Sequence, residues 1–136
     1  MIKPIIKDIE FLKIKASTVS EEDLYLIDDL KDTLKEHCDG CVGLAANMIG
    51  VSKAIIIVDI EGEYLIMVNP IIIKESEGYN TEEGCLSLEG KRSTKRYNYI
   101  KVKYKNEKMQ DRVKSYKGFS AQIIQHEIDH LNGIII

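Results

Sequence analysis

Residues 125–133, QHEIDHLNG, constrain the fold of this chain more than any other stretch, because they are typical of a helix with a buried polar face. His126 and His130 are four positions apart, so in a helix both imidazoles project from one face, with Glu127 beside them. Phe119 and Ile123 continue the histidine face. A second, neighbouring apolar stripe consists of Ile124, Ile128 and Leu131. A helix with two apolar stripes is buried on most sides, so we expect the rest of the chain to wrap around it.

Two imidazoles and a carboxylate on such a helix need partners, because each uncompensated buried polar group costs roughly 2–7 kcal/mol. A metal ion held by His126 and His130 would be that partner, with Glu127 as a proton carrier. Alternatively, both histidines are core residues satisfied by backbone carbonyls, and Glu127 points to solvent. The short motif favours the metal interpretation and leaves the other open.

Composition limits the class of protein. A chain of 136 residues with 44% hydrophobic and 30% charged residues predicts one domain, residues 1–136. The net charge of −3 gives no electrostatic argument for nucleic acid or for an anionic membrane, and the lysines between Lys91 and Lys117 alternate with apolar residues, as on a solvated strand face. The longest aliphatic run, 54–58, is too short to span a membrane, and residues 1–15 lack the apolar block of a signal peptide. We therefore expect a cytoplasmic protein.

The first half of the chain predicts one helix and one hairpin. Ser20 followed by three acidic residues reads as an N-cap, and leucines and isoleucines then recur at helical spacing, which predicts a helix over 20–37. Residues 40–50 are small and apolar, without helical or strand periodicity. Such a segment either packs tightly under the core helix or lines a site where a peptide lies against the main chain. Residues 54–60 and 64–68 read as two buried strands joined by a turn.

The second half predicts further strands and the final helix. Asn69 and Pro70 end the second strand, another begins at 71–73, and residues 82–87 interrupt the strand pattern. Residues 99–104 alternate as a half-exposed strand that pairs with 112–116. Gly118 or Ser120 is the expected N-cap of the last helix. The predicted fold class is α+β, with mostly antiparallel strands around a central buried C-terminal helix, plus an N-terminal helix.

A metal site with two histidines needs a third protein ligand, and Cys85 is the candidate. The chain has three cysteines, an odd number without an export signal, so reduced thiols or metal thiolates are expected in place of disulfides. Glu83, Gly84 and Ser87 place Cys85 in an irregular segment, whereas Cys38 lies at the end of the predicted surface helix and Cys41 lies in the glycine-rich segment. The alternative is that Cys85 is a small buried hydrophobic residue.

Three segments together resemble a known family. CVGLAANMIG at 41–50, EGCLS at 83–87 and QHEIDH at 125–130 are similar, in the same order, to the signature motifs of peptide deformylases, which remove the N-terminal formyl group from new bacterial polypeptides. The resemblance spans nearly the whole chain. It implies hydrolysis of the formyl group of N-formylmethionyl peptides, with release of formate, and a link to the ribosome.

The resemblance also implies roles for individual residues. Cys85, His126 and His130 would hold one divalent metal ion, expected to be Fe²⁺, with Zn²⁺ or Ni²⁺ as replacements. Glu127 would take a proton from the attacking water and deliver it to the departing amine, and the backbone N–H of Leu86 would bind the oxyanion. The residues implied to present main-chain groups to an extended substrate are Val42, Gly43 and Gly84. From helical spacing, we expect Phe119 and Ile123 to wall the pocket for the methionine side chain.

The most important departure from the family pattern is Met48, which stands where the first motif ordinarily has a glutamine that donates to the formyl oxygen. A thioether cannot donate, and the loss of one oxyanion donor typically lowers the rate by a factor on the order of 10²–10³. Asn47 is a substitute donor only if the local turn directs it inward. Smaller departures are Cys41 in place of glycine, Leu88–Glu89 in place of proline, and no C-terminal helix after Ile136, which by resemblance affects ribosome docking more than chemistry.

Arg96 lies about where the family has an arginine that pairs with the glutamate of the second motif, so a Glu83–Arg96 pair joined by Asp129 is expected behind the ligands. The alternative is a surface arginine. Three functional hypotheses follow from the sequence. The first is an active deformylase, the second a degenerate one that binds metal and peptide with little or no catalysis. The third is a general zinc endopeptidase, which would not need Cys85.

Overall fold

The structure is a computed structural model, and it describes residues 1–37, 41–85 and 88–134. Three α-helices lie in these ranges: α1 (Ile9–Leu12), α2 (Leu26–Glu36) and α3 (Gly118–Leu131). Two 3₁₀ turns, η1 (Glu21–Asp23) and η2 (Ala46–Ile49), precede α2 and follow the first strand. The strands of the described ranges are β1 (Gly43–Ala45), β2 (Ile55–Ile60), β3 (Glu63–Cys85), β4 (Leu88–Lys105) and β5 (Asp111–Lys117).

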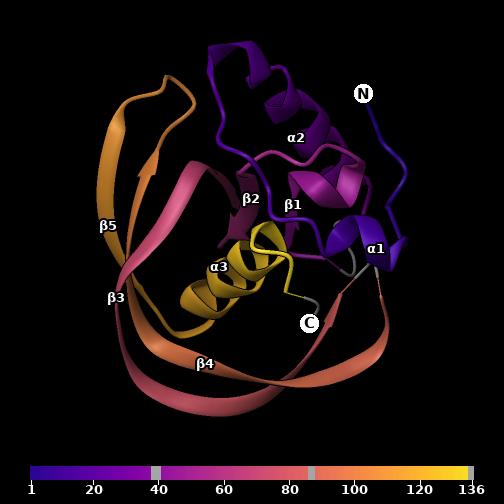
Figure 1. Cartoon of the computed structure of the whole chain (residues 1–136). Coiled ribbons are helices and arrows are strands. Elements are labelled where there is room, and N and C mark those ends of the chain that lie inside the picture. The colour runs from indigo at the N-terminus through magenta and orange to yellow at the C-terminus, as the bar shows by residue number, and fades with distance from the viewer. Residues whose placement is uncertain (38–40, 86–87, 135–136) are drawn as a thin grey trace.

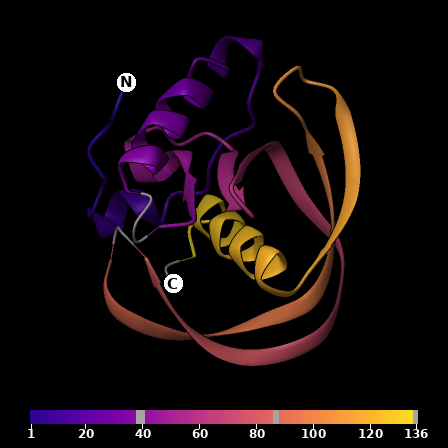
Figure 2. The same ribbon diagram turned by 180° about the vertical axis from the view of Figure 1, so that it is seen from behind.

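The strands of the described ranges form one antiparallel sheet in the order β1-β2-β3-β4-β5. Its long β3–β4 hairpin curves around α3, as both sides of the molecule show (Figure 1, Figure 2). The expected α+β fold, with antiparallel strands around a C-terminal helix, is confirmed. Within the described ranges, no helix is long and apolar enough to cross a membrane.

The hydrophobic core lies on both sides of β2. Residues Ile55 to Val58 are all fully buried, which explains why the sequence shows an unbroken aliphatic run there and no alternation. β2 lies between α2 and α3 (Figure 1), and it contacts both helices. α2 contributes Leu26, Leu30 and Leu34 at helical spacing, and α3 contributes Ile124. The final helix is therefore buried on most sides, as predicted.

The predicted helix over 20–37 starts later than expected. Ser20 is the N-cap residue of a turn, and its backbone N–H donates to the Asp23 carboxylate at 3.1 Å. The hydrogen bonds that follow are of the i→i+3 type, from Asp23 N to Ser20 O and from Leu24 N to Glu21 O. The chain is thus tightened into a 3₁₀ turn before the α-helix begins at Leu26.

The prediction that Asn69 and Pro70 end a strand is wrong, because β3 continues through them to Cys85. The pairing with β4 shifts register between Val68 and Ile71, and Asn69 has a φ of 51°, so these residues form a bulge. The Asn69 side chain stabilises the bulge by accepting from Val19 N at 2.8 Å and donating to Val19 O at 3.2 Å. These two hydrogen bonds join the bulge to a segment 50 positions away in the sequence.

β4 is also longer than the predicted strand over 99–104, since it pairs with β3 along the whole hairpin. The predicted interruption at 82–87 is wrong for residues 82–85, which belong to β3, and residues 86–87 lie outside the described ranges. β5 matches the prediction for 112–116 and pairs with β4. The N-cap of α3 is Lys117, not Gly118 or Ser120; Gly118, at a φ of 63°, lets β5 turn directly into the helix.

Candidate metal centre

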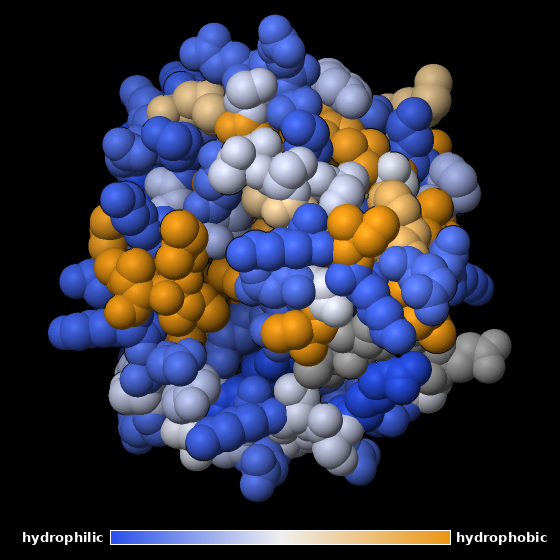
Figure 3. All heavy atoms as spheres, viewed as in Figure 1, coloured by the Kyte–Doolittle hydropathy of each residue, from blue (hydrophilic) through white to orange (hydrophobic). Residues whose placement is uncertain are grey.

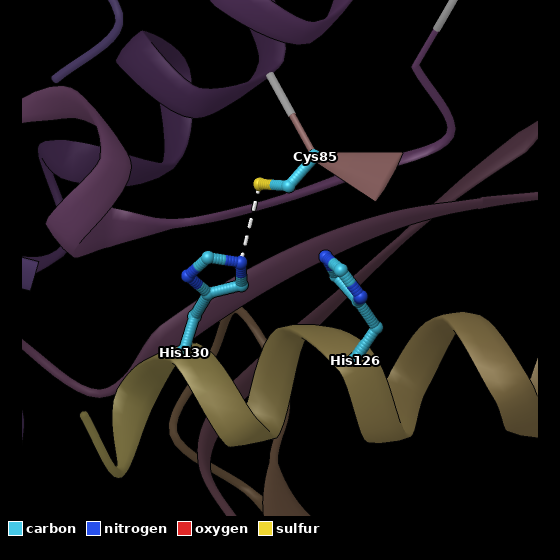
Figure 4. A group of neighbouring side chains, drawn as sticks. All are labelled: Cys85, His126 and His130. Carbon is cyan, nitrogen blue, oxygen red and sulfur yellow. Dashed lines mark hydrogen bonds between the residues drawn. The ribbon is translucent and has the colours of Figure 1, made fainter. Parts of the chain in front are cut away.

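Two helix side chains and one strand side chain converge at the start of the hairpin turn. His126 and His130 project from consecutive turns of α3, with ring centroids 5.0 Å apart. Cys85, at the end of β3, points toward them from the opposite side (Figure 4), with its Sγ 3.2 Å from His130 Nε2. One ligand atom from each of the three residues lies within 4.8 Å of the others. Both histidines are buried, and Cys85 is half-buried.

This donor set fits a divalent transition-metal ion. One thiol and two imidazoles suit Zn²⁺, Fe²⁺ and Ni²⁺, and three protein ligands leave a position for water or substrate. The site also holds buried polar atoms, His130 Nδ1 and Glu127 Oε1, without a hydrogen-bond partner among the described residues. One ion bound by Cys85, His126 and His130 would account for their convergence.

A buried ionic network lies behind His126. The Nδ1–H of His126 donates to Glu83 Oε1 at 2.8 Å, which fixes the ring and leaves Nε2 as the atom that a metal would bind, in exchange for the proton that Nε2 carries at neutral pH. Arg96 donates to Glu83 through Nη2 at 2.6 Å and through Nε at 2.9 and 3.1 Å. Arg96 Nη1 also lies 2.6 Å from Asp129 Oδ2. The structure therefore brings together the three residues that the sequence placed behind the ligands, and Arg96 is buried, not on the surface.

Sequence reasoning missed one member of this network, Gln122. Its Nε2 donates to Glu83 Oε2 at 2.9 Å, and its Oε1 accepts from the Tyr79 hydroxyl at 3.4 Å. Gln122 lies four residues before His126, on the same face of α3. That spacing is the signal that could have identified it.

The surroundings shift the pKa values of the titratable groups in different directions. Burial opposes ionisation of Glu83, but hydrogen bonds from His126, Arg96 and Gln122 lower its pKa to about 2. Burial alone would lower the pKa of His126, but Cys85 and Glu83 raise it to about 10. Burial and the charge of His126 lower the pKa of His130 to about 3. Glu83 is therefore a fixed anion against the first histidine.

Glu127 lies against β1 and faces the same site. A Cβ atom on Gly43 would come within 2.8 Å of Glu127 Oε2, so a side chain at this position would force the carboxylate to shift. Glu127 is buried, and this burial raises its pKa to about 7. A carboxyl group with a pKa near neutrality can both accept and donate a proton at the working pH of a cell.

The site opens into a cavity of about 660 Å³. Its lining includes the predicted substrate-contacting residues Val42, Gly43, Gly84, Phe119 and Ile123. Ile123 is buried, whereas Phe119 is 64% exposed and lies at the rim. Leu86, expected to donate its N–H to an oxyanion, lies outside the described residues.

Met48 lines the cavity and Asn47 does not. Met48 is buried, and its Sδ accepts from the backbone N–H of Ala45 at 3.4 Å. The η2 turn directs Asn47 elsewhere, since its Nδ2 donates to the backbone carbonyl of His130 at 2.8 Å. The condition under which Asn47 could replace the missing donor is therefore not met. Cys41, not expected at this site, also lines the cavity, and its thiol donates to Gly43 O at 2.9 Å.

The chain is similar in sequence to peptide deformylases over its whole length. The family model described as "Polypeptide deformylase" matches residues 2–136. A peptide deformylase of Clostridium beijerinckii is 51% identical over 136 residues, which is 100% of both chains. A peptide deformylase of Lachnoclostridium phytofermentans is 43% identical over 81% of this chain and 69% of its own.

Solved structures are similar over nearly the whole chain. A class I type b peptide deformylase from Acinetobacter baumannii, bound to Met-Ala-Ser, superimposes with a TM-score of 0.90 at 35% identity, and the match covers 99% of this chain and 97% of that one. A peptide deformylase from Thermotoga maritima also superimposes with a TM-score of 0.90, at 31% identity over 99% of this chain and 95% of that one.

Proposed function

The chain belongs to the peptide deformylase family of enzymes, and on that premise we propose that it hydrolyses the N-formyl group of N-formylmethionyl peptides and releases formate. The observation that carries this proposal is the convergence of Cys85, His126 and His130 next to Glu127 in one cavity. The Acinetobacter baumannii relative holds Met-Ala-Ser, a peptide that begins with methionine. The substrate would be the N-terminus of newly made proteins in the cytoplasm, close to the ribosome.

Cys85, His126 and His130 would hold one divalent ion, with Fe²⁺ expected and Zn²⁺ or Ni²⁺ as alternatives. When bound, such an ion lowers the pKa of a water molecule toward 7 and polarises an acyl oxygen. The ion pair of Glu83 with Arg96 would keep His126 oriented with Nε2 toward the thiol.

Glu127 would move the proton. Its Oε1 has no hydrogen-bond partner among the described residues, and its pKa of about 7 suits both halves of the reaction. It would accept a proton from the attacking water and give it to the departing amine when the formyl C–N bond breaks. The N–H of Leu86 is proposed to donate to the oxyanion.

The free edge of β1 would hold the substrate. β1 is the first strand of the sheet and pairs with β2 on one side, and among the described residues no strand pairs with its other edge. An extended peptide could add there as a further strand, with Val42 and Gly43 on one side and Gly84 on the other. Phe119 and Ile123 would wall the pocket for the methionine side chain.

Met48 supports a second candidate, a degenerate deformylase that binds metal and peptide with little or no turnover. Met48 supplies no hydrogen-bond donor to the cavity, and Asn47 donates to His130. Loss of one oxyanion donor corresponds to a rate lower by roughly 10²–10³. The zinc endopeptidase hypothesis is weakened by the position of Cys85, for which that hypothesis has no use.

The deciding experiment is formate release from formyl-Met-Ala-Ser by protein reconstituted anaerobically with Fe²⁺. Turnover well above that of the Glu127→Ala variant is expected, and equal turnover would refute the proposal. A strong rise in kcat for Met48→Gln would identify the natural chain as a slow deformylase. Tight binding of a formyl-peptide or hydroxamate, without turnover and without a gain from Met48→Gln, would instead identify the degenerate form. Metal retention and full activity in Cys85→Ala would favour the endopeptidase.

A further inference from the structure

The outer face of β4 carries a row of lysines and one exposed tyrosine, Tyr99. Residues 91–117 contain eleven lysines and arginines and two acidic residues, a net charge of +9 in a chain whose total is −3. β4 alternates along much of its length, so that Ile100, Val102 and Tyr104 are buried against the core. The side chains between and before them that point outward are Lys95, Tyr99, Lys101, Lys103 and Lys105, whereas Tyr97 packs against the core. We call this row, with its neighbours on β3 and β5, the β4 outer face.

Two lysines of this face stand directly opposite one another. The strand register pairs Lys74 of β3 with Lys101 of β4, and Lys101 with Ser115 of β5. Like charges directly opposite across a sheet are destabilising. Neither lysine is in an ion pair with any described residue. An anion bound between them would remove this repulsion.

A hollow of about 510 Å³ lies at this point of the surface. It is lined by Lys74, Lys101, Ser76, Tyr99 and Ser115, together with Ile100 and the carboxylate-bearing Glu75. The next row of the sheet, Lys103 between Ile71 and Val113, adds an apolar border. Figure 3 shows hydrophobic residues gathered over β3 and β5 among hydrophilic ones, and Ile71 and Val113 are 60% and 49% exposed.

The geometry points to single-stranded RNA as the ligand of the β4 outer face, with a phosphate between Lys74 and Lys101 and a base on the ring of Tyr99. The lysines extend from Lys95 to Lys103, at most roughly 26 Å along an extended strand, which is longer than any single phosphate group, and Lys105 beyond them is paired with Asp111. Tyr99 is 43% exposed in the middle of the row, and a base can stack on such a ring, whereas an acidic peptide offers no flat partner. The Ser76 and Ser115 hydroxyls in the hollow can hydrogen-bond a ribose 2′-hydroxyl.

The same strand connects this face to the metal centre, because Lys91 of β4 lines the metal-centre cavity. An RNA strand that follows β4 would therefore end near the cavity entrance. This inference does not depend on the proposed hydrolysis, since it rests on residues outside the metal centre.

The test is fluorescence anisotropy of a labelled twelve-nucleotide single-stranded RNA of mixed sequence, titrated with the full chain at several salt concentrations. We expect the double variant Lys74→Glu with Lys101→Glu to bind at least tenfold more weakly. Its slope of log affinity against log salt should be shallower by about 0.7, because the one phosphate between these two lysines no longer has a lysine partner. Lys7→Glu with Lys13→Glu makes the same charge change away from this face and should leave affinity within about twofold. Tyr99→Ala should weaken binding, and Tyr99→Phe should not, because phenylalanine also stacks.

Misfolding can be separated from a defect in binding. The single variant Lys101→Glu places opposite charges across β3 and β4, so its Tm should rise by roughly 1–4 °C while RNA affinity falls. Formate release from a short formyl-peptide should be unchanged in all of these variants. The inference is overturned if the control pair weakens binding as much as the Lys74 and Lys101 pair, or if polyglutamate of equal charge competes as well as unlabelled RNA. Binding to anionic vesicles without binding to RNA would also overturn it.

Discussion

Replacing Arg96 by methionine should destabilise the fold by about 3–5 kcal/mol, the usual loss when one partner of a buried ion pair is removed. The Arg96 side chain is 3% exposed and that of Glu83 is 7% exposed. In the variant, Glu83 would keep Gln122 and His126 as donors but would no longer accept hydrogen bonds from the guanidinium. Asp129 would lose the same partner.

The pKa of Glu83 gives a second estimate of the stability that the buried ion pair contributes. Its folded value of about 2, against an ordinary value of 4.5, corresponds to about 3 kcal/mol of stability at neutral pH, shared among its donors. A carboxylate whose folded pKa is depressed contributes fully above its unfolded pKa, and this contribution disappears as the pH falls from 4.5 to 2. The difference in the free energy of unfolding between the natural chain and Arg96→Met should therefore become smaller as the pH is lowered from 4.5 to 2.

Urea unfolding followed by circular dichroism, in the presence of a chelator, measures this loss at pH 7 and again near pH 3. Arg112→Met is the matched control, because Arg112 is exposed and its guanidinium donates to two surface groups, the Asp111 carbonyl and the Gln110 side chain. This substitution should change the free energy of unfolding by less than about 0.5 kcal/mol. Adding Glu83→Gln to Arg96→Met should recover part of the loss, since it removes the unpaired charge. A loss below about 1 kcal/mol for Arg96→Met, or one equal to the control, would refute the view that this network is buried and ionised.

Three further predictions concern the same site. Gly43→Ala would place a Cβ 2.8 Å from Glu127 Oε2, so we expect a large fall in kcat for formate release with a smaller change in KM. An unchanged kcat would show that Glu127 has room to move. Gln122→Ala removes a donor to Glu83, and metal titration should show affinity weaker by up to about tenfold, with Gln122→Glu as a comparison in which the donor becomes an acceptor. Burial raises the pKa of the Cys41 thiol to about 12, so Cys41 should react slowly with iodoacetamide at pH 8.5 in the folded chain and rapidly in urea; equal rates would contradict its burial.

Several structural features of this protein could be predicted from the spacing of residues within one element. The four-residue separation of His126 and His130 fixes both imidazoles on one face of any helix that contains them, whatever surrounds it. The aliphatic run in β2 marks a strand covered on both faces, because only such a strand has no need for polar residues. The turn after β2 is equally local, since Glu61 and Gly62 both have positive φ, at 53° and 87°. These features depend on neighbours within a few positions, so the chain order alone reveals them.

Long-range packing decided the rest. Cys85 comes within 3.2 Å of His130 across 45 positions only because β3 runs on through the bulge at Asn69 and the hairpin curves around α3. The direction of Asn47 and the pairing of Lys74 with Lys101 depend in the same way on which segments meet. Periodicity in a sequence gives the direction of a side chain relative to its own element. Its partners depend on the register between elements, which is set by the burial of the whole core.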